Sequence, residues 1–225
     1  MFDIYFLVLI VPALAFSLYA QYRVWSTYNQ YAQERSASGL TAAQAARRLL
    51  DRAGLYDVQI EAVPGQLTDH YDPRTKTLRL SAPESRSVAA LGVAAHEAGH
   101  ALQDAHGYAP LVLRNAAVPV ASFGSWLAIP LFFLGLIASI EPLMFAGILF
   151  FTGVVFFTLI TLPVEFDASR RAVQILRESG IIVAQSELEA VQKVLNAAAL
   201  TYVAAAAMAI LQLIRLVLIA RSSQR

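Results

Sequence analysis

Four apolar stretches, each long enough to cross a lipid bilayer, constrain the fold of this 225-residue chain more than any other feature. A spanning helix needs about 20 mostly apolar residues, and residues 2–20, 118–140, 143–162 and 197–220 meet that requirement. Hydrophobic residues make up 57% of the chain and charged residues only 15%, unlike ordinary soluble domains. We therefore expect residues 1–225 to form one domain, a mainly α-helical polytopic membrane bundle of about four spans embedded in the lipid bilayer.

The basic residues predict how the chain is oriented in the membrane. The polar segment 21–117 carries ten of the 17 Lys and Arg residues, and the segment 163–196 carries four. Cytoplasmic loops of membrane proteins are enriched in these residues. Both polar segments are therefore expected in the cytoplasm, with both chain ends outside.

Charge and cysteine content exclude several classes of function. The formal net charge is +1, so the chain has no basic surplus with which to bind nucleic acid. It contains no cysteine, which excludes disulfides, thiolate metal sites and a cysteine nucleophile.

The first polar segment reads as a small α/β element. Thr41 and Gly54 bracket an expected helix at residues 42–53, and residues 58–63 and 75–80 have the pattern of strands. The strand at 75–80 would be available to bind an extended substrate by β-augmentation.

Two further helices are expected in the polar segments. Ser81 and Glu84 have capping-box spacing, which predicts a helix running from there to about residue 105. Pro163 opens the second segment and predicts a separate helix at residues 164–178.

The first of these helices carries an HExxH motif, His96-Glu97-Ala98-Gly99-His100. Residues i and i+4 lie one turn apart on the same helix face, so His96 and His100 can bind one ion. Glu97 is then placed to act as general base on the attacking water, and zinc makes that water acidic enough to react at neutral pH. The motif therefore predicts metal-dependent hydrolysis, with the structural alternative that the histidines are simply a pair on an amphipathic helix.

A catalytic zinc site needs a third protein ligand, and the sequence offers two candidates. Glu165 follows the third span, and two spans separate it from His100, so it returns to the same side of the membrane. His106 occupies the position of the third histidine in an HExxHxxGxxH motif, but Gln103 stands where that motif has a turn-forming glycine. We favour Glu165, with His106 beside the site.

Longer motifs make the chain resemble the YugP-type membrane zinc metallopeptidases of bacteria. The resemblance rests on the motif continued as Ala101-Leu102-Gln103, on Gly107-Tyr108-Ala109-Pro110, and on Leu162-Pro163-Val164-Glu165-Phe166-Asp167-Ala168-Ser169. It implies a gluzincin-like site in the bacterial inner membrane, in which His96, His100 and Glu165 bind Zn²⁺ and Glu97 is the base.

The chain is also distantly similar to the HtpX-type membrane proteases, which carry a Glu-x-x-x-Asp pair whose aspartate supports a ligand histidine. Counted from Glu165, that position is Ser169 here, and Asp167 is the nearest carboxylate. Asp167 is therefore either a support for the site or a helix-terminal carboxylate. Tyr202 is either an oxyanion donor or an interfacial aromatic residue.

Together these observations predict a zinc-dependent membrane endopeptidase that hydrolyses peptide bonds of membrane or membrane-proximal proteins. The competing hypothesis is a non-catalytic membrane scaffold or chaperone in which zinc only staples helices together.

Overall fold

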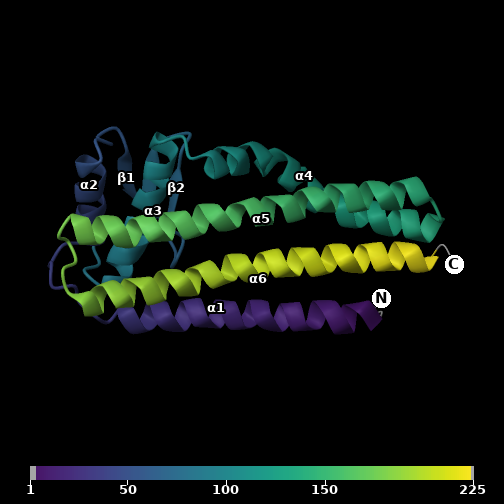
Figure 1. Ribbon diagram of the computed structural model, residues 1–225, viewed down its shortest axis with the longest axis horizontal. Coiled ribbons are helices and arrows are strands. Elements are labelled where there is room, and N and C mark those ends of the chain that lie inside the picture. Colours follow the sequence, from purple (N-terminus) through teal and green to yellow (C-terminus); the bar gives the residue numbers. More distant parts are fainter. Residues whose placement is uncertain (1–3, 224–225) are drawn as a thin grey trace. The chain divides into compact units, whose positions relative to one another are not determined.

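The computed structural model describes residues 4–223, and these residues are mainly helical (Figure 1). Residues 2 and 3 of the first expected span lie outside this part. The elements in chain order are a short π-helix η1 (Phe6–Ile10), α1 (Val11–Tyr31), α2 (Ala42–Arg52), β1 (Gln59–Ala62), β2 (His70–Asp72), β3 (Thr77–Leu80), α3 (Val88–Ala105), α4 (Ala109–Ala138), α5 (Glu141–Glu178) and α6 (Gln185–Ser223).

The chain divides into two compact units, which we describe separately. One unit, here called the apolar unit, comprises the chain up to Gln21, Val112–Pro163, and the chain from Leu200 onward. The other, called the α/β unit, comprises Tyr22–Leu111 and Val164–Ala199.

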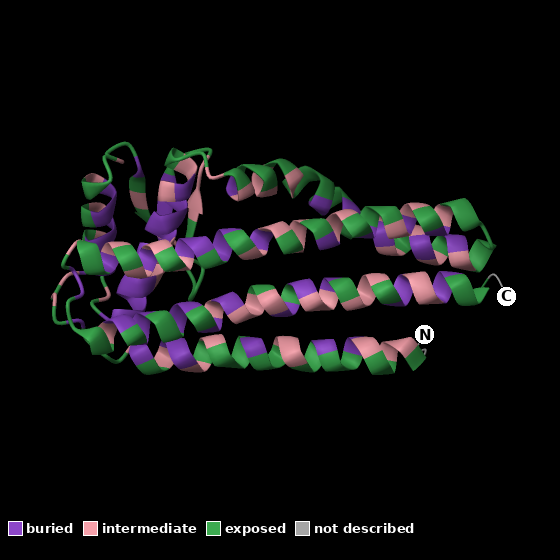
Figure 2. Ribbon diagram, in the orientation of Figure 1, coloured by how far each residue is buried: buried purple, intermediate pink, exposed green. Residues whose placement is uncertain are grey.

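Four helical segments of the described chain are long and apolar enough to cross a membrane, as the sequence predicts. They are Phe6–Tyr31, Ala109–Ala138, Glu141–Glu178 and Gln185–Ser223. Only 17–33% of the most apolar window of each segment is buried within the protein, and Figure 2 shows exposed residues along these helices. Large apolar side chains such as Ile137, 82% exposed, and Leu149, 74% exposed, therefore need lipid around them.

The α/β unit contains a three-stranded sheet with the order β1-β3-β2. β1 pairs with β3 in parallel, and β2 pairs with β3 in antiparallel orientation. The expected strand at 75–80 is thus the central strand, hydrogen-bonded on both sides. The prediction that it would accept an added substrate strand is wrong, because its backbone groups are already paired.

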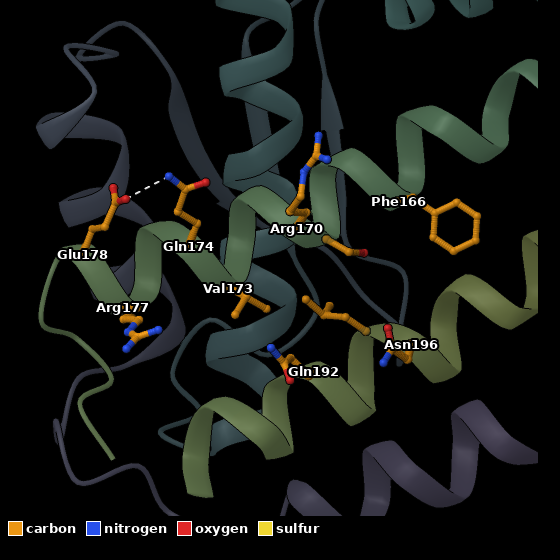
Figure 3. Close-up of a pocket in the computed structure, with 10 residues that line it drawn as sticks. Phe166, Arg170, Val173, Gln174, Arg177, Glu178, Gln192 and Asn196 are labelled. Atoms are coloured by element: carbon orange, nitrogen blue, oxygen red, sulfur yellow. Dashed lines mark hydrogen bonds between the residues drawn. The ribbon is translucent and has the colours of Figure 1, made fainter. Parts of the chain in front are cut away.

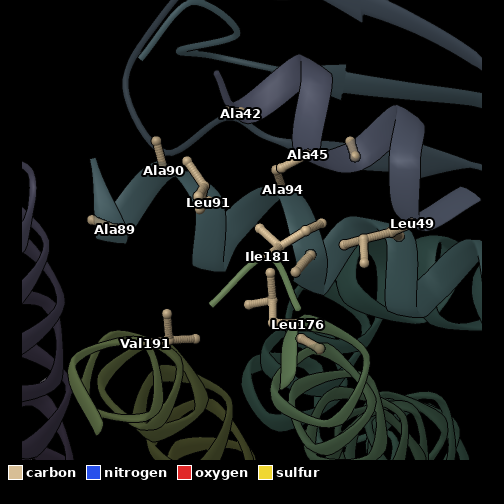
Figure 4. Close-up of a cluster of buried hydrophobic side chains, with 14 of the residues drawn as sticks. Ala42, Ala45, Leu49, Ala89, Ala90, Leu91, Ala94, Leu176, Ile181 and Val191 are labelled. Atoms are coloured by element: carbon tan, nitrogen blue, oxygen red, sulfur yellow. The ribbon is translucent and has the colours of Figure 1, made fainter. Parts of the chain in front are cut away.

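α3 runs through the core of the α/β unit (Figure 4). Its small residues Ala90 and Ala94, together with Leu91, pack among Leu49 of α2 and Val191 of α6. Alanine side chains let neighbouring helices approach closely, so packing contacts on several sides fix the position of α3.

Two helix boundaries differ from the sequence prediction. Ser81 does not cap α3, because its N–H and hydroxyl both donate to the carboxylate of Asp69, at 2.8 and 2.6 Å. The cap is Ser87, whose hydroxyl accepts a hydrogen bond from Ala90 N–H. The separate helix expected at residues 164–178 is instead part of α5, which continues through Pro163. A proline removes one backbone hydrogen bond but does not have to end a long helix in a membrane protein.

Candidate metal centre

His96, Glu97 and His100 lie on the central part of α3, with their geometry set by one helical turn. The two imidazole rings meet edge to face, with centroids 4.7 Å apart and an interplanar angle of 83°. Glu97 and His100 are buried, and His96 is half-buried. The helix therefore places two imidazoles side by side, next to a buried carboxyl group.

α5 brings Glu165 to the two histidines. Its Oε2 lies 3.3 Å from His96 Nε2 and 3.6 Å from His100 Nε2. Glu165 is itself buried, with 3% of the residue exposed. One donor atom from each of the three residues lies within 4.8 Å of the others, and residues 4–223 contain no other such group of three. Two imidazole nitrogens and one carboxylate oxygen are a donor set that suits a catalytic zinc ion, so these residues could hold that metal.

A close approach of α3 and α5 makes this meeting possible. At Gly99, a Cβ atom would lie 2.8 Å from the backbone carbonyl oxygen of Ala168 on α5. Real Cβ atoms essentially never come that near a backbone atom. The glycine inside the motif is therefore required by the packing that puts Glu165 beside the histidines.

The other edge of each imidazole meets a polar side chain. His100 Nδ1 lies 3.0 Å from Gln103 Oε1, and His96 Nδ1 lies 3.2 Å from Ser169 Oγ. Both contacts leave the Nε2 atoms directed toward Glu165. Ser169 stands at the position where the HtpX-type pattern has its aspartate.

Gln103 is the site residue that the sequence did not single out. Its side chain is completely buried and donates from Nε2 to Val164 O and to Asp167 Oδ2, each at 2.9 Å. Asp167 therefore reaches His100 only through Gln103. The one signal in the sequence is a polar residue three positions after His100, on the buried face of an apolar helix.

Burial and neighbouring groups together shift the pKa values of Glu97 and His100 on α3. Burial is the main reason that the pKa of Glu97 is raised above its ordinary value, although the neighbouring histidines oppose the shift. Burial alone would lower the pKa of His100, but its interactions with Glu165 and Glu97 outweigh that effect and the net shift is upward. A carboxyl with raised pKa is better suited to accept a proton at neutral pH.

The remaining residues singled out from the sequence lie elsewhere. His106 is the exposed C-cap of α3 and is not part of the group of three donors. Tyr202 lies in the apolar unit and is 36% exposed. His70, the remaining histidine of the chain, begins β2 and is exposed.

A cavity of about 830 Å³ lies between the parts of α5 and α6 that belong to the α/β unit (Figure 3). Ser169 is in its wall, and Gln192 and Asn196 point from α6 toward α5. Ser169 contacts the Nδ1 edge of His96, whereas Glu165 faces the Nε2 edge. Ser169 thus joins the wall of the cavity to the Nδ1 edge of His96, and none of the three grouped donors lines the cavity.

Comparison with known proteins gives the family. Residues 6–221 match the family described as "Putative neutral zinc metallopeptidase". The chain is 50% identical over 218 residues to the protein named "Putative membrane protease YugP" of Bacillus subtilis (strain 168), covering 95% of this chain and 96% of that protein. No solved structure matches the chain significantly. The chain therefore belongs to the YugP-type membrane zinc metallopeptidase family, and its four apolar helices indicate a multi-pass membrane protein.

Proposed function

We propose that this protein is a zinc-dependent membrane endopeptidase in which His96, His100 and Glu165 hold the metal. The observation that carries the proposal is the gathering of three donor atoms within 4.8 Å, on two helices, next to the buried carboxyl of Glu97. When bound, zinc supplies Lewis acidity, which lowers the pKa of water and polarises a peptide carbonyl. In this proposal the α/β unit is a zincin-like element.

Glu97 is the general base. It follows His96 directly, so its carboxylate lies beside the metal donors but is not one of the group. It takes a proton from the attacking water as the new C–O bond forms, and then passes that proton to the nitrogen of the leaving amine as the scissile C–N bond breaks. The raised pKa of Glu97 favours this shuttle, because a stronger base takes the first proton more readily.

The position of Glu165 on α5 points to membrane-proximal substrates. The apolar run at residues 143–162 ends just before Glu165, in the same helix. The metal centre is therefore placed near the end of a membrane span. The two polar segments carry ten and four basic residues, and such residues are enriched on the cytoplasmic side of membranes. In this proposal the site therefore lies on the cytoplasmic side of the bacterial inner membrane.

Within residues 4–223 the sheet ends in two edge strands, β1 and β2, each paired on one side only. β2 is the edge linked to the site helix, because the Tyr71 hydroxyl donates to Asp104 Oδ2 of α3 at 3.0 Å. β2 is therefore the edge that we assign to substrate backbone pairing.

The experiment is to purify the full chain in detergent, measure its zinc content, and follow casein cleavage with and without a chelator. Glu97→Gln is expected to keep zinc and to lose cleavage by at least ~10²–10⁴-fold, the usual cost of losing a general base. Glu178→Gln, which changes an exposed glutamate on α5, is the matched control and is expected to cleave normally. Zinc binding with no cleavage by any variant would instead support the zinc-stapled scaffold.

A further inference from the structure

Gln103 makes hydrogen bonds to polar groups on both helices of the metal centre. It lies on α3, one turn after His100, and is 0% exposed. Its Oε1 lies 3.0 Å from His100 Nδ1, and its Nε2 donates to Val164 O and Asp167 Oδ2 of α5. A buried polar side chain is costly unless it is paired, and this one is paired at both ends of its amide.

The partners of Gln103 determine which way its amide points. Val164 O is a backbone carbonyl and can only accept a hydrogen bond. The carboxylate of Asp167 faces the guanidinium groups of Arg170 and Arg171, so it is also an acceptor. The NH₂ group of Gln103 must therefore face α5, and its oxygen must face His100.

This orientation in turn decides where His100 carries its proton. The amide oxygen of Gln103 has no proton to donate, so the hydrogen bond to His100 exists only if Nδ1 bears the proton. The neutral imidazole then has its free lone pair on Nε2, the atom that lies 3.6 Å from Glu165 Oε2. That nitrogen is the one a metal ion in the group of three would use.

Asp167 is itself held by further contacts within the α/β unit. Arg171 Nε donates to Asp167 Oδ2 at 2.5 Å, and the Arg171 guanidinium lies 5.6 Å from the centroid of the Tyr108 ring. The side chain of Asp167 is 4% exposed, so little water competes for its oxygens. A continuous chain of contacts thus runs from Arg171 through Asp167 and Gln103 to His100.

We propose that Gln103 is a positioning residue that keeps His100 in the tautomer protonated on Nδ1 and aims its Nε2 at the metal position, with Asp167 acting through it. The expected effect on metal binding rests on the proposed metal centre. The tautomer of His100, in contrast, is a property of the metal-free protein. Loss of such outer contacts to a ligand histidine typically weakens metal affinity about 10- to 100-fold.

The test compares wild type with Gln103→Met, which keeps the length of the side chain and removes its hydrogen bonds. Val88→Ala is the matched control, because it removes buried volume from the same helix more than one turn from the histidines. Imidazole ¹⁵N NMR of the metal-free, full-length protein, at a pH where His100 is neutral, reports the tautomer. We expect the Nδ1–H form in wild type and in Val88→Ala, and its loss in Gln103→Met.

Zinc affinity, measured by chelator competition, is the second readout. We expect Gln103→Met to bind zinc about 10- to 100-fold more weakly than wild type, and Val88→Ala to bind it as wild type does. An unchanged His100 tautomer in Gln103→Met, or a loss of affinity no larger than that of Val88→Ala, overturns the proposal. If wild type itself binds no zinc, the proposed function fails, while the NMR comparison still decides the role of Gln103.

Discussion

The contact between Gly99 and Ala168 gives a prediction whose size can be worked out from the structure. Gly99→Ala places a Cβ atom 2.8 Å from Ala168 O, and this oxygen belongs to the backbone of α5. Restoring an ordinary contact distance of at least 3.4 Å requires α5 to retreat by about 0.6 Å. Functional geometry is held within about 0.5 Å in working sites. Glu165, three residues from Ala168, is therefore expected to leave its position beside the histidines.

The free energy of unfolding is affected by two opposing effects. Replacing glycine by alanine inside a helix gains about 0.8–1 kcal/mol. Overpacking against a neighbour that cannot move costs about 1–3 kcal/mol. The net expectation for Gly99→Ala is a destabilisation of about 0–2 kcal/mol, together with the displacement of α5.

Gly92→Ala is the matched control, because Gly92 lies on the same helix and its replacement by alanine raises the helix propensity by the same amount. The atoms nearest to its Cβ would belong to the Val191 side chain, with the two methyl carbons at 3.1 and 3.3 Å. A side chain can adjust by a few tenths of an ångström, so Gly92→Ala should be neutral or slightly stabilising. The two variants are thus expected to differ by the overpacking cost of about 1–3 kcal/mol, or about 2–12 °C in Tm for a chain of this size.

The assay is thermal unfolding of the metal-free protein in detergent, followed by zinc titration and peptide cleavage. Gly99→Ala should lower the cleavage rate on the order of tenfold or more, given that a misplacement of 1 Å can cost about 100-fold. Gly92→Ala should retain both zinc binding and cleavage. Equal Tm and equal zinc affinity for the two variants would refute the idea that the close approach of α3 and α5 sets the site.

Two further predictions concern the third ligand and the membrane topology. Glu165→Ala should lose zinc, whereas His106→Ala should bind zinc nearly as well as wild type, because His106 is exposed at the end of α3. Atomic absorption after dialysis measures the zinc content of both variants. The reverse pattern would assign the metal to His106. A reporter fused at Ala53 should lie in the cytoplasm and one fused at Glu141 should lie outside, because the basic residues cluster in segments 21–117 and 163–196. An external signal at Ala53 would contradict a cytoplasmic site.

Local signals in the sequence were sufficient where the structure depends on neighbouring residues. The helix expected at 42–53 is observed as Ala42–Arg52, because Thr41 and Gln44 form a reciprocal capping box that needs no distant partner. The helical position of the HExxH motif and the four apolar helices follow equally directly from residue spacing and hydropathy.

Features that depend on distant partners could not be predicted in the same way. Ser81 and Glu84 have the spacing of a cap, but Asp69 takes the Ser81 hydroxyl and N–H and the helix starts later. β2 has three residues and is defined only by its pairing with β3, so neither its length nor its pattern marks it. The role of Gln103 requires knowing that Val164 and Asp167 of another helix lie against it.

The separation of the donors along the chain has a consequence for the cell that makes this protein. Glu165 follows His96 by 69 residues, and all of α4 and the apolar part of α5 are synthesised in between. A nascent or truncated chain can already contain both histidines. It lacks the carboxylate of Glu165 until α4 and the apolar part of α5 have been synthesised. On the proposed assignment, the three donors are together only in a chain that has been synthesised past both apolar helices. On the proposed assignment, a chain that ends before Glu165 therefore has an incomplete set of donors and no hydrolytic site.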